Sequence, residues 1–188
     1  DDPTHDNIHT LLKEKRKCLI KGKPGSGKTS LACGIGYKFI KENPKNLVLY
    51  LTADVRSSCS QWLSQIQRGD YPYVLYIIDN CHNAIDAVNE LIGRWYRIKN
   101  AKVLLISRSI NPDLAGPSEV NYLRILEDDK CLINSDISVE TIRQIVKLYV
   151  PYREAKEKKI GDTKKILEKC QGDLHLLNYY IKAWLKND

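Results

Sequence analysis

The hydrophobic positions of the chain follow two periods, which predict alternating strands and helices. Apolar runs without polar alternation are typical of strands buried on both faces of a parallel sheet, and they occur at residues 18–20, 46–52, 73–79 and 101–107. Apolar residues at helical spacing lie before and between these runs, at residues 4–16, 30–41, 57–69 and 84–99. This order predicts an α/β fold of three layers, in which helices cover both faces of one parallel sheet.

Two of the predicted helices have a clear inward face. In the segment 57–69 we expect Trp62, Leu63 and Ile66 to face the core, with Gly69 at the helix end. The segment 84–99 carries a single apolar stripe made of Ile85, Val88, Leu91, Ile92 and Trp95.

The pattern changes after residue 111. A loop leads to a last expected strand within residues 122–134, and the chain from Ser138 onward is helical in character, with breaks at Pro151 and Gly172. We therefore expect two domains, an α/β core at residues 1–134 and a small α-helical subdomain at residues 135–188.

The composition limits the class of protein. With 188 residues, 43% of them hydrophobic, the chain can bury one core and a small appendage. No apolar run approaches the about 20 residues that span a bilayer, and no signal-peptide pattern follows Asp1. We expect a soluble, cytoplasmic protein without membrane contact. Because the sequence lacks methionine and starts at Asp1, we also expect it to be part of a longer protein.

Cysteines and charge exclude some sites and leave others open. The six cysteines include no CxxC pair, and we expect buried, reduced thiols rather than disulfides or a zinc site at Cys18, Cys33, Cys59, Cys81, Cys131 and Cys170. The formal net charge of +7 permits contact with nucleic acid without establishing it. Glutamates interrupt the basic tracts at residues 13–17 and 152–159, which favours solvated helix faces over nucleic-acid binding.

One glycine-rich loop carries specific chemistry. Residues 22–29, GKPGSGKT, match the phosphate-loop pattern GxxxxGK[ST] in full, after a predicted strand and before a predicted helix. The glycines let backbone N–H groups turn inward around an anion, and the helix N-terminus adds a partial positive charge. We expect the nucleotide to contact Gly22, Lys23, Pro24, Gly25, Ser26, Gly27, Lys28, Thr29 and Ser30.

Within this loop, two side chains have distinct expected roles. The ammonium of Lys28 would lie against the outer phosphates, and the hydroxyl of Thr29 would take one position of an octahedral Mg²⁺. A glycine-rich turn that matches the pattern by chance is the alternative, and the flanking strand and helix disfavour it.

Polar residues at the ends of two further strands extend the site. Asp79 ends an apolar run at the edge where parallel sheets bind ligands, so we expect it to hold the Mg²⁺ water shell rather than to cap the next helix. Arg108 follows Ser107 at the end of the run 101–107, where its guanidinium would contact the terminal phosphate. The alternative for Arg108 is a surface arginine at the start of a loop, and the sequence does not separate the two.

These motifs together resemble a known class of proteins. GKPGSGKTSLA, IIDNCH and KVLLISRS, followed by KCQGDLHLLNYY, are similar in order and spacing to the STAND class of signal-transducing ATPases, which includes the NACHT and NB-ARC types and is related to AAA+ ATPases. The resemblance covers residues 10–188 and implies that the helical subdomain is a lid. It also implies that the strand ending at Ser107 lies between the phosphate-loop strand and the strand ending at Asp79, with Arg108 beside the γ-phosphate.

The chain departs from the family pattern at two positions. Relatives carry a second acid after the Mg²⁺ aspartate, whereas this chain has Asn80, whose amide can position water but cannot accept a proton near neutral pH. His82 is the nearest titratable candidate for a base, although a polar residue at a helix start without a catalytic part is the simpler interpretation. At the lid, Leu174 stands where NB-ARC proteins place a proline against the adenine, and it can still pack on the base.

The sequence thus favours an ATP-binding switch that uses ATP, ADP and Mg²⁺ and hydrolyses ATP slowly, within a larger signalling or defence protein. The resemblance implies flanking sensor and effector domains and a homo-oligomer in the ATP state, and the preference for adenine rests on it alone. Two alternatives remain: an AAA+ motor or loader acting on nucleic acid, and a nucleotide-binding scaffold without hydrolysis.

Overall fold

The computed structural model describes residues 3–64, 71–94, 98–108, 130–132, 168–169, 176–177 and 179–180. The chain separates into two compact units, residues 1–22 with 28–133 and residues 23–27 with 134–188. Nearly all of the predicted lid lies outside the described residues. Its helices and the domain boundary at residue 134 therefore stay predictions.

Within the described residues, five parallel strands form one sheet in the order β2-β3-β4-β1-β5. Their bounds are Lys17–Gly22 for β1, Leu47–Thr52 for β2, Val74–Asp79 for β3, Ala101–Arg108 for β4 and Lys130–Leu132 for β5. The central place of β4, between β1 and β3, confirms the arrangement that the resemblance implied. The expected last strand is β5, which pairs with β1.

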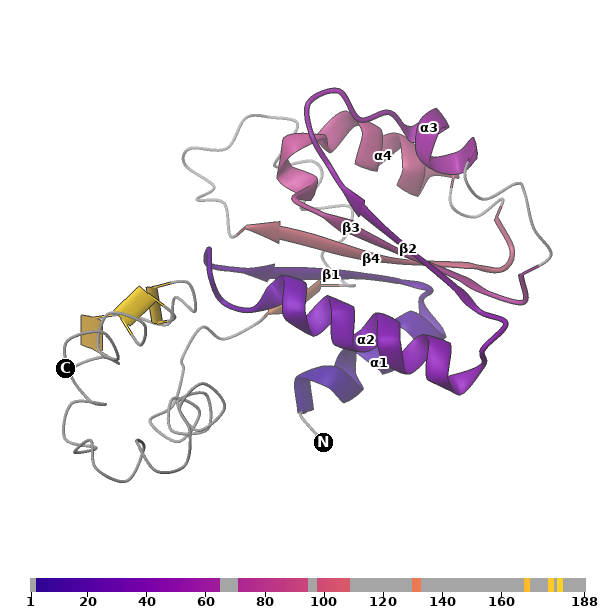
Figure 1. Ribbon diagram of the computed structural model, residues 1–188. Helices are drawn as coiled ribbons and strands as arrows, with labels where there is room; N and C mark the ends of the chain where they lie inside the picture. The colour runs from indigo at the N-terminus through magenta and orange to yellow at the C-terminus, as the bar shows by residue number, and fades with distance from the viewer. Residues whose placement is uncertain are drawn as a thin grey trace. The chain divides into compact units, whose positions relative to one another are not determined.

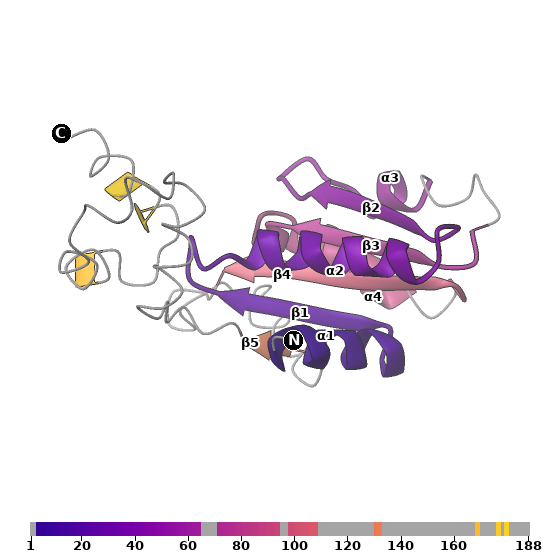
Figure 2. The ribbon, with the colours of Figure 1, turned by 60° about the horizontal axis from the view of Figure 1, so that its bottom comes forward.

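Helices cover both faces of this sheet, as Figures 1 and 2 show. One face carries α1 (Pro3–Glu14) and α2 (Lys28–Glu42), and the other carries α3 (Cys59–Ser64) and α4 (Ile85–Arg94). A short 3-10 helix, η1 (Cys81–Asn83), lies between β3 and α4. The three-layer α/β fold predicted from the sequence is confirmed.

The side chains of the central strands alternate between two hydrophobic clusters. Cys18 and Ile20 of β1 pack with α1 and α2, whereas Leu19 between them packs with the α3 and α4 layer. All six residues of β3 are buried. Since both faces of these strands are covered, their sequences show no polar alternation.

Strand β2 differs from its prediction, because it lies at the edge of the sheet. Four of its residues are partly buried, and Tyr50 and Thr52 are exposed, whereas both faces were expected to be buried. The two predicted helices that follow are also shorter in the described part: α3 begins at Cys59 and α4 ends at Arg94. Trp62 is buried as expected, whereas the predicted contributions of Ile66, Gly69 and Trp95 lie outside the described residues.

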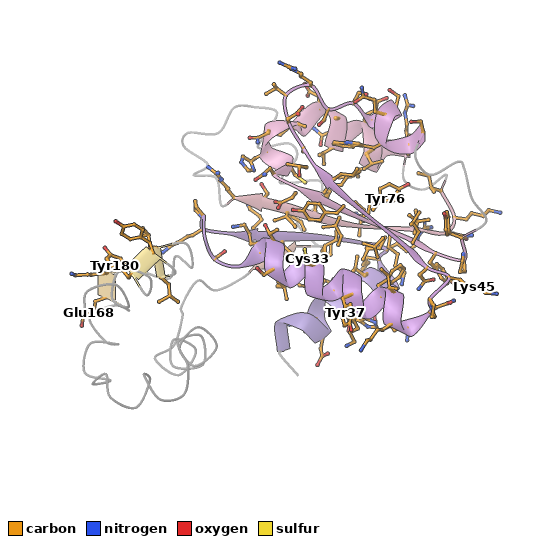
Figure 3. The ribbon with its side chains drawn as sticks, in the orientation of Figure 1. Cys33, Tyr37, Lys45, Tyr76, Glu168 and Tyr180 are labelled. Atoms are coloured by element: carbon orange, nitrogen blue, oxygen red, sulfur yellow. The ribbon has the colours of Figure 1, made fainter. Side chains whose placement is uncertain are left out.

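Helix α2 approaches the sheet closely at Gly36. A Cβ atom at this position would lie 3.0 Å from Cδ1 of Ile77 and 3.2 Å from Cγ1 of Val48. Cys33, three residues earlier on the same helix, is exposed rather than buried as predicted, while Cys18, Cys59 and Cys81 are buried, reduced thiols. Figure 3 shows Cys33 on α2.

Candidate functional site

The glycine-rich segment forms a tight turn between β1, which ends at Gly22, and α2, which begins at Lys28. Gly25 and Gly27 have φ angles of 71° and 82°, in the left-handed region that residues with a Cβ rarely adopt. The N–H of Ser26 donates to the carbonyl oxygen of Lys23 at 3.3 Å. This backbone conformation explains why the loop needs glycine at these two places, and it fits the expected anion cradle.

Lys28 lies at the first position of α2, which begins two residues before the predicted start. Its side chain is 8% exposed, and its Nζ donates to the carbonyl oxygen of Gly22 at 3.0 Å. Thr29 and Ser30 follow on the first turn and are exposed. The ammonium thus lies between the end of β1 and the start of α2.

The structure brings together the two predicted Mg²⁺ ligands. The hydroxyl of Thr29 donates to Oδ2 of Asp79 at 2.7 Å, and the N–H of Asn80 donates to Oδ1 at 2.7 Å. Asp79 is 7% exposed at the carboxyl end of β3. A buried carboxylate is stable only when its oxygens are hydrogen-bonded, so these donors hold it in a fixed orientation.

Tyr50 joins this cluster and was not predicted. Its hydroxyl donates to Oδ2 of Asp79 at 2.7 Å, to the same oxygen that Thr29 contacts. Burial of the hydroxyl raises the pKa of Tyr50 above its ordinary range, and the hydrogen bond to the Asp79 carboxylate adds a smaller increase. The phenol therefore stays protonated and remains a donor at neutral pH. The sequence pattern alone indicates Tyr50 only as an apolar strand residue.

Asn80 has a left-handed backbone, with φ 57° and ψ 36°. Asparagine, aspartate and glycine tolerate this conformation better than other residues do. The carbonyl oxygen of Asn80 accepts from the N–H of Asn83 at 2.9 Å, which closes the turn into η1. The backbone thus gives a reason for asparagine here that does not depend on catalysis.

The remaining predicted site residues are placed less directly. Arg108 is exposed at the end of β4, where it pairs in register with Gly22 at the start of the glycine-rich turn. Its neighbour Ser107 is 1% exposed, and among the described residues its hydroxyl has no hydrogen-bond partner. His82 is partly buried in η1, two residues beyond Asn80. Leu174 lies outside the described residues.

These residues fit a nucleotide with Mg²⁺. Hydroxyl and carboxylate oxygens are the donors that Mg²⁺ prefers, and Thr29 and Asp79 present one of each. The hydroxyl of Ser107, which has no hydrogen-bond partner within the described part of the chain, adds a buried polar atom at the same strand ends. No other metal site competes within the described part of the chain, where no three His, Cys, Asp or Glu side chains are grouped to hold an ion.

No helix in that part has the length and apolarity to cross a membrane.

Comparison with solved structures supports the same fold. The chain is similar to PCH-2 of C. elegans, with a TM-score of 0.57 and 17% identity over 94% of this chain and 58% of that one. It is similar to a point mutant of RuvB from Thermotoga maritima, with a TM-score of 0.61 and 13% identity over 95% of this chain and 60% of that one. The chain is also similar to domain III of the replication initiation protein DnaA from Thermotoga maritima. Here the TM-score is 0.56 and the identity 16%, over 98% of this chain and 85% of that one.

These likenesses, all at 17% identity or less, show the fold that the chain shares with PCH-2, RuvB and domain III of DnaA. The chain spans about three fifths of the length of PCH-2 and RuvB. No curated protein matches the sequence. The sequence itself matches one family, described as Novel STAND NTPase 3, over residues 1–151, which include the glycine-rich turn, Asp79 and Arg108. The chain therefore belongs to the Novel STAND NTPase 3 family.

Proposed function

We propose that the chain is an ATP-binding switch with slow, Mg²⁺-dependent ATP hydrolysis. The observation that carries the proposal is the hydrogen bond of 2.7 Å between Thr29 Oγ1 and Asp79 Oδ2, directly after the glycine-rich turn. This pairing would supply the hydroxyl and the carboxylate of a nucleotide-bound Mg²⁺ site. Membership of a family of STAND NTPases supports nucleotide hydrolysis in general.

Each residue of the site would have a separate part in binding. Backbone N–H groups of residues 23 and 25–27 would surround the phosphate chain, and Lys28 would leave Gly22 to contact the outer phosphates. Bound Mg²⁺ would neutralise charge on the phosphate oxygens. Thr29 would turn its hydroxyl toward that ion, and Asp79 would accept hydrogen bonds from the surrounding water. Arg108, opposite Gly22 in the sheet register, would contact the terminal phosphate.

Tyr50 would keep Asp79 in position during this exchange. When Thr29 turns away, Oδ2 of Asp79 loses one donor, and the Tyr50 hydroxyl remains as the second donor to that oxygen. A carboxylate that keeps its hydrogen bonds does not need to reorient when the ligand arrives. We therefore assign Tyr50 as a positioning residue for the Mg²⁺ site.

Slow hydrolysis follows from Asn80. General bases contribute about 100- to 10,000-fold to reaction rates, and an amide cannot take this role. His82, two residues further on, is a candidate for a replacement base. A nucleotide-binding scaffold without hydrolysis is the second candidate function, because Asn80 also has a backbone role that requires no catalysis.

The proposed context is a larger signalling or defence protein. In the family pattern the ADP state is closed by a lid and the ATP state opens and assembles into an oligomer. The lid at residues 135–188, with Leu174 against the base, and flanking sensor and effector domains are the corresponding proposals for this chain.

One experiment tests the proposal and separates it from the scaffold. Single-turnover hydrolysis of ATP and GTP with Mg²⁺ is measured beside the binding of ADP and GDP. Slow ATP cleavage with tight ADP retention supports the switch. Binding without cleavage supports the scaffold, and absence of nucleotide binding refutes both.

A further inference from the structure

A cavity of about 560 Å³ lies at the end of the sheet where the strands start, whereas the candidate nucleotide site lies where the strands end. It is lined by residues at the start of β4, including Ala101 and Lys102, whereas Arg108 and Gly22 lie at the far ends of β4 and β1. Its volume falls within the about 300–1,000 Å³ of small-molecule sites. All of its lining residues belong to the described part of the first unit.

The lining is strongly basic. Lys13 comes from α1, and Arg16 follows this helix. More than eighty residues later, Lys99 lies in the turn before β4 and Lys102 at the start of this strand. One carboxylate, Glu42, faces these four cations. Oε1 of Glu42 is already hydrogen-bonded to Nε2 of His9 at 2.8 Å, so part of the charge of this carboxylate already interacts with His9. The cavity therefore concentrates positive charge beyond what its own carboxylate balances.

Lys102 is the cation at the centre of this arrangement. Its Nζ lies 5.5 Å from the ring centroid of Phe39 and 5.6 Å from that of Tyr73, so aromatic rings hold the ammonium in place. Burial lowers the pKa of Lys102, and the charges of Lys13 and Arg16 lower it further, while Glu42 opposes the shift. An anion in the cavity would relieve both the repulsion and the loss of hydration.

Arg16 fixes one wall of the cavity. Its Nε and Nη2 donate to the carbonyl oxygen of Ala101 at 3.2 and 3.1 Å, and Nη2 also donates to the carbonyl oxygen of Ile98. Its own carbonyl oxygen accepts from the N–H of Val103 at 2.9 Å, and its backbone is left-handed, with φ 61°. These bonds join the segment after α1 to the start of β4. The basic residues are thus held close together before a ligand arrives, which lowers the entropic cost of binding.

We propose that this cavity, with Lys13, Arg16, Lys99 and Lys102 converging on it beside Tyr73, binds a compact anion that carries several phosphate charges. Lysine is suited to phosphate as a flexible point charge, and four cations match a polyphosphate better than a single carboxylate. The site is separate from the glycine-rich turn and does not depend on the proposed function. The phosphates can come from a free polyphosphate or from the backbone of a nucleic acid, and the test distinguishes these sources.

The test measures binding of inorganic tripolyphosphate by calorimetry without Mg²⁺. Lys28→Ala is used as the background, so that the glycine-rich turn does not contribute. In this background, the added changes Lys13→Gln and Lys102→Gln should weaken tripolyphosphate binding at least about tenfold, because each removes a close charge. Glutamine keeps most of each side chain, which preserves packing against Phe39 and Tyr73. Added salt should weaken binding to the parent chain.

The control pair is Lys45→Gln with Arg94→Gln, which removes the same charge from exposed positions that do not line the cavity. It should change the tripolyphosphate affinity less than about twofold. Failure of the Lys28→Ala chain to bind tripolyphosphate, or equal losses in both pairs, would overturn the proposal. A fluorescent ATP analogue, tested on each pair with Lys28 intact, should bind both with the affinity of the unmodified chain. Its result judges the proposed function separately.

A short single-stranded oligonucleotide serves as the second probe. If it binds and loses affinity in the cavity pair alone, the backbone phosphates of nucleic acid are a source of the ligand. If it does not bind while tripolyphosphate does, the source is a free polyphosphate. Oligonucleotide binding that is equal in both pairs, without tripolyphosphate binding, contradicts the proposal.

Discussion

Thr29 and Asp79, fifty positions apart in the sequence, are joined by a hydrogen bond of 2.7 Å between Oγ1 and Oδ2. The first lies one residue into α2 and the second ends β3, so the bond connects the helix N-terminus to the sheet. Both atoms are ordinary Mg²⁺ ligands or acceptors for its water shell. The contact relates the glycine-rich turn to an acid that is distant from it in the sequence.

Lys28→Ala is expected to abolish nucleotide binding. Lys28 is 8% exposed, and its ammonium is directed at the carbonyl oxygen of Gly22, where the glycine-rich turn begins. Loss of a charged contact to phosphate costs about 3 kcal/mol, which weakens binding more than about 100-fold. Titration with a fluorescent ATP analogue measures this loss. Lys45→Ala, at the turn between α2 and β2 that is labelled in Figure 3, is the control. Unchanged affinity in Lys28→Ala would remove the basis of the proposed function.

Asp79→Ala should weaken Mg²⁺-dependent ATP binding by about 100-fold and leave Mg²⁺-free binding nearly unchanged. The carboxylate supports the ion rather than the phosphates, so its effect requires Mg²⁺. Asp79→Asn is a second variant that keeps the shape of a side chain contacted by Thr29, Tyr50 and Asn80. The measurement is the ATP affinity of both variants, once with Mg²⁺ and once with a chelator. Equal losses in both conditions count against the metal role.

Tyr50→Phe should raise the Mg²⁺ concentration needed for half-maximal ATP binding by about tenfold. The change removes only the hydroxyl that donates to Asp79 Oδ2. Because Tyr50 is 43% exposed, loss of its packing is small and the stability of the chain should hardly change. Mg²⁺ titrations at fixed ATP analogue measure the shift, with Tyr37→Phe on α2 as a matched control. A lower affinity without Mg²⁺ as well would mean that the role is structural.

Asn80→Asp should raise single-turnover hydrolysis at least about 100-fold if the missing acid limits the rate. Aspartate tolerates the left-handed backbone at φ 57°, whereas Asn80→Glu is expected to lose about 1 kcal/mol of folding free energy to strain. Rates and unfolding midpoints of both variants therefore need to be compared. An unchanged rate in Asn80→Asp, with the fold intact, would shift attention to His82 or to the scaffold function.

The free energy of unfolding should fall at alkaline pH because of Tyr76. This side chain is fully buried, and burial raises its pKa above the value of about 10 that a tyrosine has in an unfolded chain. Above that pH the unfolded chain releases the proton while the folded chain keeps it, so stability is full below about pH 10 and is lost as the pH rises. Denaturant unfolding at a series of pH values should show a weaker decline in Tyr76→Phe. Tyr37→Phe, 62% exposed, should leave the decline unchanged, and Figure 3 labels both positions. The same decline in Tyr76→Phe would contradict the assignment.

The sequence predicted the parts of the site that depend on local patterns. The glycine-rich turn has a fixed spacing, and Asp79 directly follows an apolar run, so neither needed knowledge of the tertiary structure. The place of β4 came from the family resemblance. Tyr50 could not be found this way, because its role depends on the neighbouring strand and on the orientation of its side chain. In the run LVLYLT, nothing indicates which residues face Asp79.

The basic cavity was missed for a similar reason. Lys13 and Arg16 belong to a tract in which glutamates suggested a solvated face, and Lys99 and Lys102 lie beside a different strand. Only the parallel pairing of β1 with β4 places the starts of these two strands side by side, and with them the basic residues. The exposure of β2 also depends on sheet order, since a run of apolar residues is compatible with a central strand and with an edge strand.

The close approach at Gly36 has a consequence for how natural variants of this chain should be interpreted. A larger residue there, such as valine, would meet Ile77 and Val48 and displace α2 from the sheet. Thr29 lies on the same rigid helix, so a shift of a few tenths of an ångström at position 36 would lengthen its bond to Asp79. A variant two turns away from Thr29 would then weaken Mg²⁺-dependent nucleotide binding in a protein that is otherwise folded, and a genetic screen would count it as a binding-site mutation.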